Sequence, residues 1–171
     1  MEMRRRVSEG GLKRFLICGL KRMGLGDPAK CVVLGLRRLD PRAIRHRSRM
    51  LSFYSQFVSA GSLCFDVGAN TGNRTEVFLR LGAKVVAVEP QAECTKELER
   101  RFGRNRSVVL VRKGLDEKPG EKELLISNAN PISSFSKEWI LAVTQSGRFS
   151  AYNWDRSELV PMTTLDALIE S

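Results

Sequence analysis

The chain has 171 residues, of which 42% are hydrophobic and 28% charged, and this composition provides enough apolar material for one globular domain. Its longest apolar stretches, at 15–20 and 31–36, are far shorter than the roughly 20 residues that cross a bilayer, which excludes a membrane-spanning protein. The apolar segment after the arginines at 4–6 is too short for a secretory signal and has no clear small-residue cleavage site. We therefore expect a cytoplasmic protein.

The formal net charge of +10 is carried by the N-terminal part of the chain. Residues 1–49 contain 14 Lys and Arg residues and four acidic residues, whereas residues 50–171 contain 15 of each. This asymmetry predicts a basic helical extension over 1–49 and a charge-balanced domain over 50–171. Nucleic acid or an anionic membrane surface would attract such an extension, although a solvated basic face has the same composition. Aromatic residues are sparse before Phe53, so no stacking platform is present and nucleic acid is not the expected partner.

Metal binding is not predicted. The four cysteines form no C-x-x-C pair, and His46 is the single histidine. We expect Cys64, which lies in an apolar run, to be a small buried residue.

Residues 1–42 are predicted to form short helical pieces joined by turns, and a helix over 43–60 follows. From residue 63 the pattern alternates between apolar strands and amphipathic helices. The strands are expected at 63–67, 84–88 and 107–112, with helices at 73–81 and 91–102 between them. This alternation predicts an α/β fold, with a parallel sheet, right-handed crossovers and helices on the faces of the sheet.

The character of the chain changes after the third strand. A turn at 117–121 and a strand at 122–127 indicate a hairpin-like excursion, and a helix at 136–144 follows. Residues 159–163 are expected to be extended, with Thr164 as the cap of a last helix over 164–169.

The strongest functional signal is the segment 65–72 (FDVGANTG) after the first strand, together with Glu89 at the end of the second. Ligands of open α/β sheets bind at the carboxyl ends of the strands, where both groups lie. Gly68 and Gly72 permit a tight turn and a close approach of the backbone to a ligand. Glu89 follows Asp66 by 23 residues, a spacing typical of a carboxylate that binds both ribose hydroxyls. The pattern predicts a nucleoside-containing cofactor.

The loop also narrows the choice of cofactor. A dinucleotide site has G-x-G-x-x-G, whereas only G-x-x-x-G is present, which disfavours NAD and FAD. No G-x-x-x-x-G-K-[ST] motif for a nucleotide triphosphate occurs. S-adenosylmethionine needs no phosphate cradle, and Asp66 suits the positive amino and sulfonium groups of its methionine half. S-adenosylmethionine therefore fits best, and a tight turn without a ligand is the alternative.

The segments 66–73 (DVGANTGN) and 81–90 (LGAKVVAVEP) together resemble the FkbM-type methyltransferases. The resemblance continues through 108–115 (VVLVRKGL), the serines at 133 and 134, and 160–169 (VPMTTLDALI), and it covers about residues 50–170. It implies a Rossmann-like class I methyltransferase fold with S-adenosylmethionine as cofactor. The residues it implies for the cofactor are Asp66, Gly68, Ala69, Asn70 and Gly72 on the methionine side, Glu89 at the ribose, and Gly114, Leu115 and Asp116 near the adenine.

The sequence departs from the family pattern after the T-L-D-A-L segment at 164–168. The family continues there with a strand bearing a K-I-D-x-E-G-like motif and with the rest of the sheet, neither of which this sequence contains. We therefore expect an incomplete parallel sheet in which one side of the first strand is unpaired. Such a chain is a fragment, a truncated gene product, or half of an assembly that another chain completes.

The expected activity is methyl transfer from S-adenosylmethionine to oxygen, with a small-molecule, sugar or lipid hydroxyl as acceptor. A truncated non-catalytic remnant and a basic binding module are the alternatives. No catalytic base can be assigned, because His46 lies among arginines where a solvated surface position is expected. Ser133, Ser134 and Trp139 follow the third strand and are candidates for the acceptor site, although an ordinary loop and a core tryptophan fit the sequence better.

Overall fold

The computed structural model describes residues 41–147 and 149–170. The predicted helical pieces before residue 41 lie outside this range. The chain divides into two units between Arg49 and Met50, and each unit is described by itself.

Helix α3 (Pro41–Tyr54) begins in the first unit and ends in the second. It ends six residues before the predicted end at residue 60, so that boundary was wrong. The side chains of Ser55 and Gln56 donate to the carbonyl of Ser52 at 3.0 and 3.4 Å, while the N–H of Gln56 donates to Phe53 O instead of continuing the helix.

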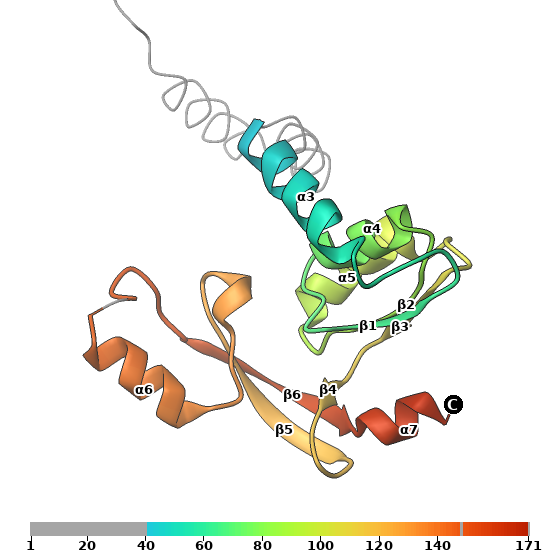
Figure 1. The fold of residues 1–171 in the computed structure, drawn as a ribbon. Coiled ribbons are helices and arrows are strands. Elements are labelled where there is room, and N and C mark those ends of the chain that lie inside the picture. The colour runs from blue at the N-terminus through green and yellow to red at the C-terminus, as the bar shows by residue number, and fades with distance from the viewer. Residues whose placement is uncertain (1–40, 148, 171) are drawn as a thin grey trace, which may run out of the picture. The chain divides into compact units, whose positions relative to one another are not determined.

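The first sheet of the second unit has three parallel strands (Figure 1). Its strands, in spatial order, are β1 (Leu63–Val67), β2 (Lys84–Val88) and β3 (Val108–Val111). The crossovers are the helices α4 (Asn73–Arg80) and α5 (Ala92–Phe102). The predicted α/β class, with a parallel sheet of Rossmann-like connectivity and flanking helices, is confirmed.

One face of this sheet carries the core. Residues paired across the sheet share a face, as Cys64, Val85 and Val108 do, and this face packs against the apolar sides of α4 and α5. Leu98, a core residue of α5, is 1% exposed. Figure 1 shows both helices on the same side of the sheet, as two successive right-handed crossovers in one direction require.

The opposite face of the sheet carries apolar side chains that are exposed on the outer strands β1 and β3, whereas Val88 of the central strand is buried, although the sequence predicted helices on both faces. Leu63, Val67 and Val109 are 60%, 47% and 58% exposed. Strand β1 is also an edge strand, with no partner on its outer side among the described residues, as expected. The described chain therefore leaves one edge and one face of the sheet available for further structure.

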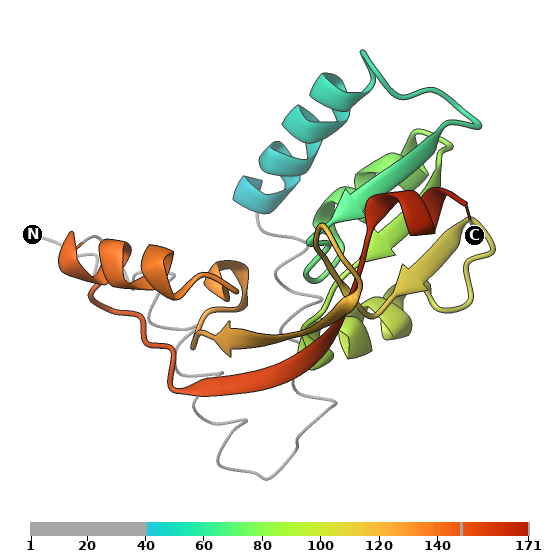
Figure 2. The same cartoon turned by 90° about the horizontal axis from the view of Figure 1, so that it is seen from below.

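A second three-stranded sheet follows the first. It has the order β4–β6–β5, formed by β4 (Gly114–Leu115), β6 (Arg156–Thr163) and β5 (Gly120–Ile126). Figure 2 shows β5 and β6 side by side as a long antiparallel ribbon. A separate small core, with Leu124, Val160 and Met162 among its members, holds this sheet together. The excursion was predicted, but β4 and its parallel pairing with β6 were not.

The remaining elements are short. They are the 3₁₀ turn η1 (Asn130–Ile132) and the helices α6 (Lys137–Gln145) and α7 (Leu165–Ile169). Thr164 caps α7 as predicted, because its Oγ1 accepts a hydrogen bond from the N–H of Ala167 at 3.1 Å. Among the described residues, no helix has the length and apolarity needed to cross a membrane.

Candidate functional site

The loop between β1 and α4 lies at the carboxyl edge of the parallel sheet, and its backbone is strongly constrained. Gly68, Asn70 and Gly72 have φ values of 69°, 51° and 82°, which lie in the left-handed region. All five backbone N–H groups from residue 68 to 72 donate hydrogen bonds within the chain. Their acceptors are Val88 O for the first two, then Glu89 Oε2, Asn70 Oδ1 and Ala69 O. The loop therefore keeps no N–H group for a phosphate.

Glu89, directly after β2, joins two segments of the site. Its Oε2 accepts from the N–H of Asn70 at 2.8 Å, and its Oε1 accepts from the N–H of Gln91 at 2.9 Å. The side chain is buried, and this burial raises the pKa of Glu89, against the lowering effect of the two backbone hydrogen bonds. The nearby carboxylates of Asp66 and Glu158 raise the pKa of Glu89 further.

Glu158 enters the site from β6, far away in the sequence. Its Oε1 accepts a hydrogen bond from the N–H of Ala92 at 3.0 Å, at the N-terminus of α5. An acidic side chain is favourable at this end of a helix. Sequence reasoning did not identify Glu158, because no local pattern relates β6 to the start of α5.

Asp66, the last but one residue of β1, is turned toward α4. Its Oδ2 accepts from both the N–H and the hydroxyl of Thr75, at 2.9 and 2.6 Å. The N-cap of α4 is Gly72, which has no side chain to cap the helix, so Asp66 supplies the acceptor. Asp66 Oδ1 is buried and has no hydrogen-bond partner in the described part of the chain. The guanidinium of Arg74 lies 3.8 Å from this oxygen.

The two glycines of the loop have different surroundings. A Cβ at Gly68 would meet no atom within 4 Å, so this part of the loop faces open space. A Cβ at Gly72 would lie 2.5 Å from the ring of Phe102 and 2.8 Å from Leu98. Gly72 therefore allows the loop to pack against α5, and Gly68 is the glycine at which a ligand can approach the backbone.

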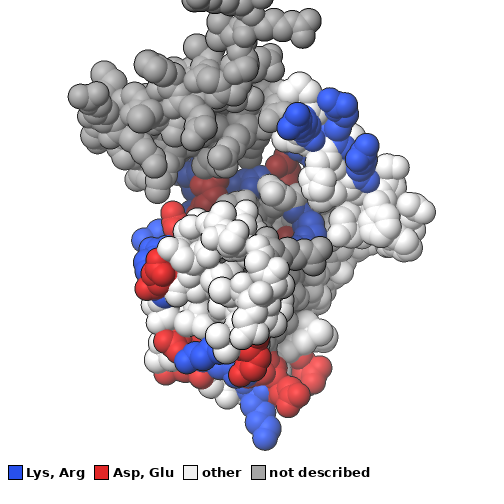
Figure 3. Space-filling view, turned by 90° about the vertical axis from the view of Figure 1, so that its left-hand side faces the viewer, with Lys and Arg blue, Asp and Glu red and all other residues white. Residues whose placement is uncertain are grey.

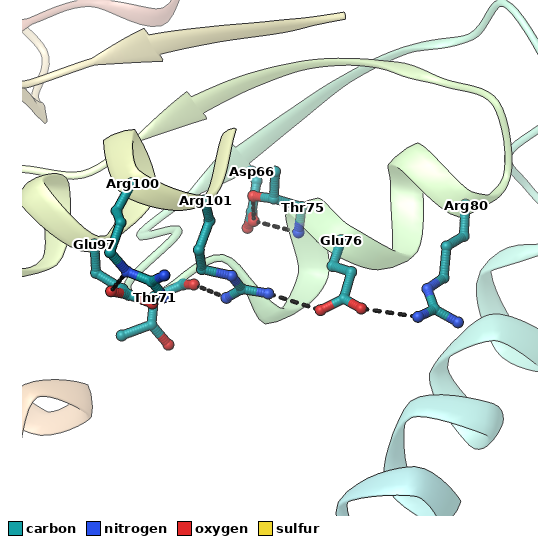
Figure 4. A network of polar contacts seen from close by, with 8 residues as sticks. All are labelled: Asp66, Thr71, Thr75, Glu76, Arg80, Glu97, Arg100 and Arg101. Carbon is teal, nitrogen blue, oxygen red and sulfur yellow. Dashed lines mark hydrogen bonds and ion pairs between the residues drawn. The ribbon is translucent and has the colours of Figure 1, made fainter. Parts of the chain in front are cut away.

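Arg101 of α5 contacts both the same loop and helix α4 (Figure 4). Its guanidinium donates to the carbonyl of Thr71 and forms an ion pair with Glu76 of α4 at 2.7 Å. The Arg101 side chain is only 8% exposed, and its guanidinium lies 4.7 Å from the ring centre of Phe102. Sequence reasoning missed Arg101, since α5 carries several charged residues and nothing local distinguishes this one.

The residues expected near the adenine belong to the second sheet. Gly114 and Leu115 form β4, and a Cβ at Gly114 would lie 2.5 Å from the methyl group of Met162. Asp116 forms an ion pair with Lys122 at 2.5 Å, and the hydrogen bond from Lys122 lowers the pKa of Asp116. The structure thus brings the loop and Glu89 together, whereas Gly114 to Asp116 pair with residues of the second sheet. Ala69 is buried within the loop.

The candidates for an acceptor site lie in the excursion. The hydroxyl of Ser133 accepts from the N–H of Ser127 at 3.2 Å, and the backbone of Ser134 pairs with Leu125. Trp139 is 39% exposed, so the alternative that it is a core tryptophan was wrong. It contacts Trp154 edge to face, with ring centres 6.2 Å apart.

The remaining candidates contribute nothing to this loop. His46 lies exposed on α3. Cys64 is half-buried rather than buried, and burial raises the pKa of its thiol. The described residues contain no group of three side chains able to hold a metal ion.

The chain matches no known family and no curated protein. One similar solved structure is described as a "putative RNA methyltransferase" from Pyrococcus horikoshii; it is 27% identical over 39% of this chain and 35% of that chain, with a TM-score of 0.35. Another, a "putative rRNA-methylase" from Clostridium thermocellum, is 18% identical over 39% of this chain and 41% of that chain, with a TM-score of 0.34. Each similarity thus covers less than half of this chain and less than half of the matched chain.

Proposed function

We propose that residues 50–171 form the cofactor-binding half of an S-adenosylmethionine-dependent methyltransferase of the FkbM type. The observation that carries this proposal is the position of Glu89. Its carboxylate follows the second of two adjacent parallel strands and is bound to the glycine-containing loop that follows the first. This is where open α/β sheets bind nucleosides.

The Glu89 carboxylate is suited to a ribose. Each of its oxygens accepts one backbone hydrogen bond, and a carboxylate oxygen has a second lone pair. Both oxygens therefore retain an acceptor site for a vicinal diol. The two backbone N–H groups also fix the orientation of the carboxylate before any ligand binds, which reduces the entropy that binding must remove.

The methionine half of the cofactor, which carries an ammonium and a sulfonium, fits the other side of the loop. The buried Asp66 Oδ1 lacks a hydrogen-bond partner among the described residues, and the space in front of Gly68 is open. Because the loop has no unused N–H group, it favours a cationic ligand over a phosphate. We assign Ala69, Asn70 and Gly72 to the same loop.

Gly114, Leu115 and Asp116 are proposed to lie near the adenine. This assignment is supported by their position just after β3, whose carboxyl end lies at the same edge of the sheet as those of β1 and β2.

When bound, S-adenosylmethionine supplies an electrophilic methyl group that a nucleophile attacks in line. The residues described here bind and orient the donor, and we assign no general base to them. We propose a hydroxyl of a small molecule, sugar or lipid as the acceptor. We further propose that another chain extends the sheet at β1 and covers its exposed face, because Leu63, Val67 and Val109 leave an apolar surface there.

Isothermal titration calorimetry of the chain with S-adenosylmethionine tests this proposal. Saturable binding is expected for the wild-type chain and for Glu121→Ala, which removes an exposed acid of β5. Glu89→Ala should abolish binding while the chain stays folded by circular dichroism, and NAD should not bind. A folded wild-type chain that does not bind S-adenosylmethionine would instead identify a non-catalytic remnant.

A further inference from the structure

Helix α3 carries a basic face on its first two turns. Four exposed side chains have the spacing of one side of a helix: Arg42, Arg45, His46 and Arg49. We call these four residues the α3 basic face. The sequence of α3 itself contains no acidic residue. Figure 3 shows basic side chains standing out from this helix at the upper right.

The side chains of the α3 basic face line an open hollow of about 420 Å³. Three of them are guanidinium groups, whose planar array of donors matches the oxygens of a phosphate. A surface with this shape and charge is suited to a ligand that presents several phosphates in succession.

We infer that the α3 basic face binds the phosphate backbone of a nucleic acid, without selecting its sequence. An anionic membrane is the competing partner, because α3 also carries the exposed apolar side chains of Ile44 and Phe53, and helices in a membrane interface insert such side chains. The composition of the α3 basic face favours nucleic acid, because three of its four residues are arginines and none is a lysine. Residues 1–49 contain eleven arginines and three lysines, and arginine is the residue typical of nucleic-acid recognition.

This inference departs from the expectation, drawn from the shortage of aromatic residues before Phe53, that nucleic acid is not a partner of the basic extension. Contacts to phosphates require charge and not stacking, so they need no aromatic platform. The inference does not depend on the proposed methyltransferase function, since the α3 basic face belongs to the first unit of the chain.

The size of the effect follows from counterion release. If each of the three arginines neutralises one phosphate of a single strand, each contributes about 0.7 to the slope of log affinity against log salt concentration. Replacing all three should reduce that slope by about 2. At about 0.1 M salt the same replacement should weaken binding by about 100-fold.

The experiment uses the full chain and a fluorescein-labelled polyuridylate of about 20 nucleotides, with anisotropy measured across a salt series. Arg42→Gln/Arg45→Gln/Arg49→Gln is the test variant, and glutamine preserves helix propensity. The matched control is Arg104→Gln/Arg106→Gln/Lys118→Gln, which removes the same charge from exposed positions elsewhere. The slope should fall by about 2 in the test variant and by less than about 0.5 in the control.

Three results would overturn the inference. These results are an absence of RNA binding by the wild-type chain, a wild-type salt slope in the test variant, or a loss of slope in the control as large as that in the test variant. Vesicles of phosphatidylcholine and phosphatidylserine provide the last arm. Binding to these vesicles that needs the three arginines, without binding to RNA, would assign the α3 basic face to a membrane and refute the nucleic-acid proposal.

Discussion

Removing the carboxylate of Asp66 should destabilise the second unit by several kcal/mol. Oδ2 of Asp66 accepts from the N–H and the hydroxyl of Thr75 at 2.9 and 2.6 Å, and the two residues are 2% and 0% exposed. Asp66→Ala leaves both donors buried without an acceptor, at about 1–3 kcal/mol each. It also removes a negative charge from the N-terminus of α4, worth about 0.3–1 kcal/mol. We therefore expect the free energy of unfolding to fall by about 3–5 kcal/mol.

Graded variants distinguish this explanation from a general effect of mutation. Asp66→Asn keeps one acceptor oxygen but loses the charge, and should cost about 1–2 kcal/mol. Thr75→Val removes the hydroxyl alone, so Asp66→Ala should cost about 1–2 kcal/mol less in that background than in the wild type.

Urea unfolding followed by far-ultraviolet circular dichroism measures these differences, and amide hydrogen exchange reports on Thr75 directly. The Thr75 amide should exchange much faster in Asp66→Ala than in the wild type. A cost below about 1 kcal/mol with a protected Thr75 amide would refute the proposed capping role of Asp66.

Other substitutions separate packing from ligand contact. Gly72→Ala should lower the free energy of unfolding in urea by about 3 kcal/mol, because its Cβ meets α5 side chains and its φ is 82°. Gly68 faces open space, so Gly68→Ala should lower that free energy by only about 1 kcal/mol. Its main effect should be weaker binding of S-adenosylmethionine in calorimetry. Equal stability losses would contradict this distinction. Arg101→Met should cost about 2 kcal/mol, because its buried ion pair and its bond to the loop are lost, and a loss below about 0.5 kcal/mol would contradict that role. Val85→Ala should cost about 2 kcal/mol and Val109→Ala less than about 0.5 kcal/mol, whereas equal costs would show that the Val109 face is covered in solution.

The first sheet was predictable because its signals are local. Each strand is a short apolar run, and the glycines at 82 and 103 follow the two helices almost at once. The second sheet was only partly predictable. Two residues suffice for β4, and its pairing partner, β6, begins more than 40 residues later. No pattern within a short window contains that information.

The site divides in the same way. Gly68 and Glu89 could be proposed as site residues from the sequence, because a glycine after one strand and an acid after the next form a recognisable pattern. Arg101 and Glu158 reach the site from α5 and β6, so their contributions depend on tertiary packing. The resemblance assigned Asp66 to the methionine side of the cofactor, whereas in the structure both hydrogen bonds of its carboxylate cap α4.

The most direct test of the proposed site measures the affinity for S-adenosylmethionine as a function of pH, by calorimetry on the wild-type chain and on Glu89→Gln. Burial raises the pKa of Glu89, so the carboxylate should accept a proton as the pH falls through a value above the usual glutamate range. Protonation removes the charged acceptor from the ribose. We predict saturable binding near neutral pH that weakens up to about tenfold per pH unit below this pKa, and weak, pH-insensitive binding by Glu89→Gln. Equal affinities and equal pH profiles for the two chains, or no binding by the folded wild-type chain, would contradict the proposed role of Glu89.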